Sequence, residues 1–160
     1  MSDIKTKYGT GNQTITVTLA SLTNNSQRES TAIDNTTNLF LDALVGGKVK
    51  SPASATSATG SINVYAYGTD DGGTTYSDGA TGSDAGITLT APPNVRLIGV
   101  INVVANAVTY KFGPFSVAAA FGGILPASWG LIFENKTGGT LDSTGGNHAI
   151  HYQGVLAQVG

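Results

Sequence analysis

The stretch Ser61-Ile-Asn-Val-Tyr-Ala-Tyr67 decides the fold class, because an aliphatic side chain occupies every second position. Ile62, Val64 and Ala66 recur with a period of two, which is the period of a strand that buries one face. The segment Thr14-Ile-Thr-Val-Thr-Leu19 shows the same alternation, with threonines between its apolar residues. Both segments indicate β-structure.

The composition favours the same class. The chain has 160 residues, with 22 Gly, 21 Thr, 13 Ser and 11 Asn, and only 11% of its residues are charged. Residues that favour helices are therefore scarce, while those that favour strands and turns are abundant. The hydrophobic fraction is 40%, which is enough to build the core of one domain of this length.

Further strand-like segments recur along the chain, separated by turns rich in Gly, Pro and Asn. They cover residues 38–45, 87–90, 95–104, 108–112, 114–120, 129–134 and 149–159. Eight or nine short strands of this kind predict an all-β fold, an antiparallel β-sandwich with a jelly-roll-like arrangement. We expect a single sandwich domain over residues 14–160 and a flexible N-terminal arm over residues 1–13. The pair Gly46-Gly47 predicts a β-bulge or a tight bend.

The charge pattern excludes several classes of partner. The formal net charge is -2, and the eight basic residues are scattered along the sequence. Binding to nucleic acid or to an anionic membrane needs several cations on one face, so we expect neither partner. The absence of cysteine excludes disulfides and thiolate metal sites. The N-terminal segment has no apolar stretch typical of a signal peptide, so we expect a soluble protein made in a cytoplasm.

Three predicted strands are apolar on both faces, whereas a sheet with one wet face alternates apolar and polar residues. They lie within residues 97–104, 115–121 and 129–133. One interpretation is a subunit interface, since large exposed apolar patches rarely persist on monomers. Its candidate residues are Ile98, Val100, Phe115, Phe121, Trp129 and Ile132. The alternative is that the chain's own loops cover the second face.

The sequence offers little catalytic chemistry, and we expect neither enzymatic activity nor a cofactor. Acid–base catalysis needs paired carboxylates or a positioned histidine, and neither pattern stands out. The best candidate for a metal is the loop 68–86, whose Asp70, Asp71, Asp78 and Asp84 carry the hard oxygen ligands that Ca²⁺ prefers. Ordinary turn chemistry explains the same aspartates. His148 and His151 are three residues apart, a spacing that places them on opposite faces of a strand.

Two smaller patterns have both a functional and a structural interpretation. Tyr65, Tyr67 and Tyr76 lie near the aspartate-rich loop and are suited to stacking on a sugar ring, or to packing across strands. Arg28 is followed by Glu29, Asp34 and Asp42, so a bidentate ion pair that fixes the connection 23–37 is expected there. A solvated loop that adds nothing to stability is the alternative.

Several longer phrases resemble a known group of proteins. They are RESTAIDNTTNLFLDALV (28–45), INVYAYGTDDGGTTYSD (62–78), LIGVINV (97–103), GPFSVAAAFGGILPASWGLIFEN (113–135) and HYQGV (151–155). These phrases are similar to small virion structural proteins encoded in the head and tail gene clusters of tailed bacteriophages. The resemblance extends over most of residues 14–159, but it is a resemblance of strand phrases rather than of a motif with known chemistry.

The resemblance implies a capsid decoration, or cement, protein on the outer surface of the phage head. Such a protein would bind the major capsid protein and associate with itself, with a homotrimer favoured, and would be located in the virion after synthesis in the host cytoplasm. A tail or neck component is one alternative. A carbohydrate-binding β-sandwich module is the other.

Overall fold

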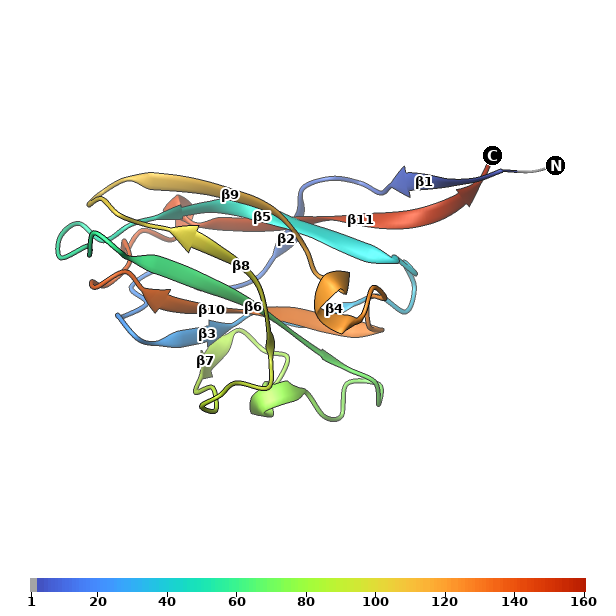
Figure 1. Cartoon of the computed structure of the whole chain (residues 1–160), viewed down its shortest axis with the longest axis horizontal. Helices are drawn as coiled ribbons and strands as arrows, with labels where there is room; N and C mark the ends of the chain where they lie inside the picture. Colours follow the sequence, from blue (N-terminus) through green and yellow to red (C-terminus); the bar gives the residue numbers. More distant parts are fainter. Residues whose placement is uncertain (1–2) are drawn as a thin grey trace.

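Two antiparallel sheets pack face to face in the computed structural model, which describes residues 3–160 (Figure 1). The first sheet has the order β1 (Ile4–Tyr8), β11 (Ala149–Val159), β5 (Asp42–Lys50) and β9 (Thr109–Ser116), and β2 (Gln13–Ile15) also pairs with β11. The second has the order β7 (Ala85–Ile87), β3 (Gln27–Glu29), β10 (Ser128–Lys136), β6 (Ser61–Thr69) and β8 (Arg96–Asn102), and β4 (Ile33–Asp34) also pairs with β10. The predicted all-β antiparallel sandwich is confirmed.

The main core lies between the two sheets and follows the period of two. Ile62, Val64 and Ala66 of β6 are buried, as the alternation predicts. They belong to one hydrophobic cluster with Val45 of the first sheet and Trp129 of β10. The edge-to-face contact between the rings of Trp129 and Tyr152, with centroids 5.4 Å apart, links the two layers.

A third layer covers part of the second sheet from outside. The connection from β6 to β8 runs beneath this sheet in Figure 1 and includes the short 3-10 helix η1 (Ser77–Gly79) and β7. Its Ala80 and Val95 are buried against Tyr67 and Ile132, which form a second apolar cluster. Strand β10 is therefore buried on both faces by its own chain.

The bulge expected at Gly46-Gly47 is confirmed within β5. The register against β9 shifts between Val45 and Gly47. A Cβ atom at Gly47 would lie 2.2 Å from the carbonyl oxygen of Ala149, so only glycine allows the two strands to approach this closely.

The expected flexible arm is wrong in its central part. Residues 4–8 form β1, which pairs antiparallel with residues 155–159 of β11. Residues 1 and 2 of the expected arm lie outside the described residues. No helix in the described part of the chain is long and apolar enough to span a membrane, since η1, η2 (Ala118–Phe121) and η3 (Gly145–Asn147) are single turns.

Candidate functional site

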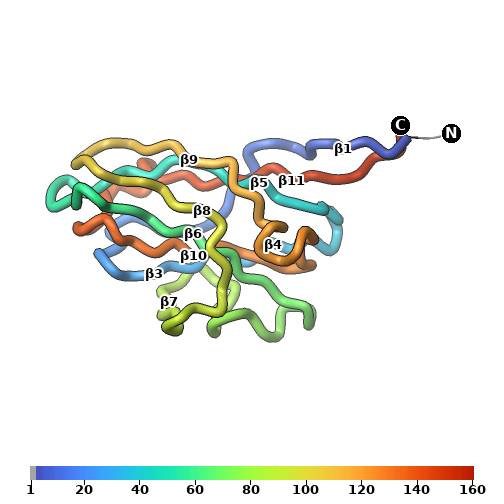
Figure 2. The backbone as a smooth tube through the Cα atoms, viewed as in Figure 1, coloured from blue at the N-terminus to red at the C-terminus, as the bar shows by residue number. Residues whose placement is uncertain are grey.

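Strand β1 and the end of β11 form a two-stranded ribbon that projects from the sandwich, with both termini at its tip (Figures 1 and 2). We call residues 4–8 and 155–159 the terminal ribbon. All five residues of β1 are exposed. Only β1 pairs with residues 156–159 of β11, because the pairing of β5 ends where Asp42 faces Val155. Residues 4–8 and 157–159 are exposed, and Val155 and Leu156 at the base of the ribbon are half-buried.

One face of the terminal ribbon is apolar. The register places Ile4 opposite Val159, Thr6 opposite Ala157, and Tyr8 opposite Val155, and residues that face each other across strands share one side of a sheet. Ile4, Tyr8 and Val159 are 78%, 59% and 66% exposed. The opposite face carries Lys5, Lys7, Leu156 and Gln158. The ribbon is therefore amphipathic, with its apolar side in solvent.

An aromatic contact fixes the base of the ribbon. The Phe40 ring lies against Gly154, where an added Cβ would be 2.4 Å from ring carbons, and also against Gly9, where it would be 3.1 Å away. The amide of Leu41 donates to the carbonyl of Val155 over 2.7 Å. Leu39 and Leu41, on either side of Phe40, are both exposed. They extend the apolar surface at this end of the molecule.

The structure corrects two of the predicted interface residues. Trp129 and Ile132 are fully buried, the first between the sheets and the second under the β6–β8 connection. The apolar character of β10 on both faces reflects a core covered by the chain's own loop, and neither residue is available to a partner.

The other predicted interface residues lie nearer the surface. Val100 is exposed on the edge strand β8, whereas Ile98, Phe115 and Phe121 are partly buried against the main core. Ile98 and Phe115 line a common hollow of about 510 Å³ between β8 and β9. The structure thus brings these two together and places Phe121 in a different groove.

The aspartates proposed for calcium do not converge. Within residues 3–160, no group of three His, Asp or Glu side chains is arranged to hold a metal ion. Asp71 accepts hydrogen bonds from the amides of Thr74 and Thr75, and Asp78 accepts from the amides of Asn94 and Val95. Asp71 thus fixes its own turn, as turn chemistry predicted, whereas Asp78 links η1 to the segment before β8.

Asp84 is the partner of Arg28. The guanidinium Nε lies 2.6 Å from Asp84 Oδ1, and one terminal nitrogen donates to the Asp84 carbonyl over 2.8 Å. The hydroxyl and amide of Thr18 also donate to this carboxylate. Burial alone would raise the pKa of Asp84, but these donors outweigh it and hold the pKa below its ordinary value. Arg28 thus forms an ion pair, but not the bidentate pair expected with the nearby carboxylates of Glu29, Asp34 or Asp42.

Two buried carboxylates escaped the sequence analysis. Glu29 accepts from the amide and hydroxyl of Thr81, each over 2.8 Å. Glu134 accepts from Asn63, Gln27 and Tyr65. Burial opposes its charge, yet these donors together with Lys136 hold the pKa of Glu134 below its ordinary value. Glu134 directly follows the apolar run 131–133 of β10, which marks it in the sequence, whereas Glu29 has polar neighbours and no such signal.

The tyrosines and histidines have structural contacts. Tyr67 is fully buried and packs edge to face against Tyr76, with ring centroids 5.3 Å apart. Tyr65 donates to Glu134, so these three rings do not form a sugar-stacking platform. His148 contacts the backbone of Asp142 and Lys50, whereas His151 is half-buried beside Gly46. The described residues show no metal site around the two histidines.

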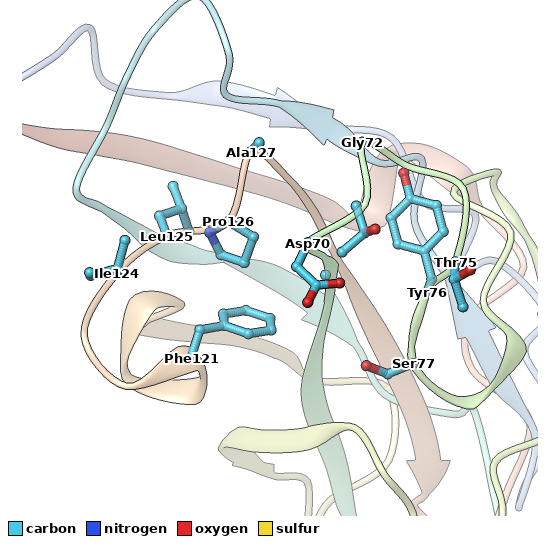
Figure 3. A pocket seen from close by; sticks show the side chains of 12 residues that line it. Asp70, Gly72, Thr75, Tyr76, Ser77, Phe121, Ile124, Leu125, Pro126 and Ala127 are labelled. Carbon is cyan, nitrogen blue, oxygen red and sulfur yellow. The ribbon is translucent and has the colours of Figure 1, made fainter.

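A groove opens at the end of β6, between the loop 69–77 and the segment 121–127 (Figure 3). Its volume is about 760 Å³. Phe121, Ile124, Leu125 and Pro126 lie on one side, and Asp70, Thr75, Tyr76 and Ser77 lie on the other. The side chains of Phe121, Asp70 and Ser77 point toward the same open space. The groove is thus apolar on one wall and polar on the other.

No protein-family model, curated protein or solved structure matches this chain.

Proposed function

We propose that this chain is a structural protein of a tailed-bacteriophage particle. Its proposed role is that of a capsid decoration protein on the outer surface of the head, which associates with itself and bridges subunits of the major capsid protein. The sequence phrases support the virion class by resemblance. The terminal ribbon supports a role in assembly.

The apolar face of the terminal ribbon is the observation that carries this proposal. A two-stranded ribbon without a packed face is marginally stable in water. Here the ribbon exposes Ile4, Tyr8 and Val159 on one side. Exposed apolar patches of this kind mark interaction surfaces, and burial of this face would stabilise the ribbon. The ribbon is therefore suited to lie on a neighbouring subunit in an assembled shell.

A second exposed apolar surface lies away from the ribbon. Leu97, Val100, Val104 and Val108 are exposed along β8 and the turn into β9. The β8–β9 turn and the terminal ribbon lie at opposite ends of the long axis (Figure 1). Two different apolar surfaces on one chain favour head-to-tail contacts, which close into a ring when the rotation permits. A homotrimer is the ring that we propose.

The charge of the chain agrees with a place outside the shell. The net charge is -2, and Lys5 and Lys7 lie on the face of the ribbon opposite to Ile4 and Tyr8. A chain without a dense basic surface gains little from contact with packaged DNA, since affinity for DNA comes largely from cations on phosphates.

Gold labelling of the protein on intact phage particles tests the proposed location. We expect label distributed over the outer surface of the head in electron micrographs. Label confined to the tail or the neck would contradict the decoration role and would support a tail or neck component instead. Absence of label from purified particles, with the protein left in the lysate, would overturn the virion assignment.

A further inference from the structure

We infer that the groove between residues 68–77 and 121–127 is a binding site for a neutral saccharide. This inference does not depend on the proposed role in the virion. It rests on the pairing of an apolar wall with a polar wall across one open space (Figure 3). A pyranose ring has the same division, with C–H faces and a rim of hydroxyl groups.

The apolar wall is held in place by the end of β6. A Cβ atom at Gly68 would lie 2.9 Å from the Phe121 ring and 2.9 Å from Pro126 Cγ, so both rings rest on the bare glycine backbone. Gly122 follows Phe121 in the left-handed conformation and ends η2 there. The ring is thus positioned before any ligand arrives, which lowers the entropic cost of binding.

The polar wall is also ordered by contacts within the chain. Asp71 ties the loop through the amides of Thr74 and Thr75, at 3.0 and 2.9 Å. The Tyr76 hydroxyl lies 2.9 Å from Ser128 Oγ, which fixes the ring at this side of the groove. Asp70, by contrast, has no hydrogen-bond partner within residues 3–160. Its carboxylate can therefore accept hydrogen bonds from a ligand.

The lining favours a neutral polyhydroxyl ligand over other classes. Asp70 is the one charged residue among the residues that line the groove, so an anionic ligand would be repelled. Ser77 and Thr75 carry hydroxyls, which both donate and accept, as sugar hydroxyls do. An ammonium group can use acceptors only and would leave the donors of this wall unmatched. A volume of about 760 Å³ accommodates a disaccharide.

Titration followed by amide NMR signals tests this site. Maltose, cellobiose, lactose and N,N′-diacetylchitobiose are each added to about 20 mM, which suffices to detect a Kd near 1 mM. We expect at least one of them to shift the signals of residues 68–77 and 121–127 in a saturable manner. Choline and arginine, added in the same way, probe the cationic alternative.

Two variants connect the shifts to the proposed contacts. Asp70→Ala removes an exposed carboxylate without a partner in the chain, and Phe121→Ala removes the apolar platform. Each is expected to raise the Kd at least about tenfold. Asp3→Ala and Leu97→Ala, which remove a carboxylate and an exposed apolar side chain elsewhere, are expected to leave the Kd unchanged. If Phe121→Ala fails to fold, Asp70→Ala still tests the site, because the loss of an exposed carboxylate leaves the packing of the protein intact.

Three outcomes would overturn the inference. The first is that none of the four disaccharides shifts the groove signals. The second is that Asp70→Ala binds as tightly as the unchanged protein. The third is that choline or arginine occupies the groove more tightly than every sugar.

Discussion

Glu29 ties the β6–β8 connection to strand β3. Its carboxylate is buried and receives the amide and hydroxyl of Thr81 at 2.8 Å and the amide of Gly82 at 3.3 Å. Ala32, near Glu29 in sequence, donates its amide to the Gly82 carbonyl over 2.9 Å. These bonds hold the loop layer that covers Ile132, so one side chain supports a whole layer.

Replacement of Glu29 by alanine should therefore be costly. The change removes the buried acceptor of three hydrogen bonds from Thr81 and Gly82, and such losses reach about 3 kcal/mol of unfolding free energy. Urea denaturation measures this difference. Asp70→Ala, which removes an exposed carboxylate without a partner, should stay within about 0.5 kcal/mol. Equal stability of the two variants would contradict the assigned role of Glu29.

Acid should destabilise the fold through carboxylates that act as hydrogen-bond acceptors. The side chain of Asn147, the amide of Thr144 and the ammonium of Lys50 lower the pKa of Asp142 to about 2. The hydroxyl of Thr69 and the amide of Thr75 lower the pKa of Asp71 to about 2. Because the folded state binds protons less readily than the unfolded chain, the stabilisation is present above about pH 4 and is lost toward pH 2.

Melting temperatures between pH 5 and about pH 2 check this dependence. The unchanged protein should melt at progressively lower temperatures below about pH 4. Asp142→Asn removes one titrating group and should make this decline shallower. A decline of the same depth in the variant would show that Asp142 is not among the groups responsible.

At the scale of the elements, strict alternation predicted the strand at 61–67 but not the one at 14–19, where only β2 (Gln13–Ile15) forms, and the short polar strands were not predicted. The alternation at 61–67 became β6, and the predicted strand at 129–134 lies within β10. The strands β3 and β4 fall in what the sequence marks as a polar connection, because Gln27 and Arg28 carry no apolar pattern. Both pair with β10, which is distant in sequence: β3 at Ile132 and Phe133, and β4 at Ser128 and Trp129. Whether such short polar segments form strands is decided by contacts with residues distant in sequence.

The terminal ribbon escaped prediction for the same reason. The alternation of Ile4, Thr6 and Tyr8 with two lysines is visible in the sequence, but it is short and lies at a terminus. Terminal segments are generally frayed unless tied down. Here β11 supplies the partner, at a sequence distance that no local pattern reveals.

Hydrogen exchange tests the ribbon as an element. In the unassembled chain, we expect the amides of β1 to exchange much faster than those of β10, because β1 pairs on one side only and lies outside the core. On phage particles, burial should slow the exchange of β1 at least about tenfold. Equal exchange of β1 in the free and particle-bound protein would show that the ribbon remains in solvent.

At the scale of the whole molecule, charged residues are scarce, at 11% of the chain. One cause is a deep interior, since the chain buries both faces of β10, one between the sheets and one under its own loop. For Trp129 and Ile132, the interpretation as a subunit interface is wrong, and the alternative of cover by the chain's own loops is confirmed. A pattern of apolar residues reports that a face is covered, but not whether the same chain or another one covers it.

Several exposed apolar side chains lie toward the two ends of the molecule. Ile4, Tyr8 and Val159 lie on the ribbon, while Val104 and Val108 lie at the β8–β9 turn. The groove lined by Phe121 and Asp70 is separate, and no sequence pattern predicted it because its walls come from segments about 50 residues apart. The molecule thus has exposed apolar residues toward its ends and a separate groove with one apolar and one polar wall.

Co-sedimentation with phage particles that lack the protein tests the central claim most directly. Ile4→Glu places a charge on the apolar face of the ribbon, and Gln158→Glu places the same charge on its opposite face; both positions are exposed, so the sandwich should remain folded in each. We predict that the unchanged protein and Gln158→Glu bind particles, and that Ile4→Glu binds at least about tenfold more weakly. Equal binding of the two variants, or no binding of the unchanged protein, would contradict the account.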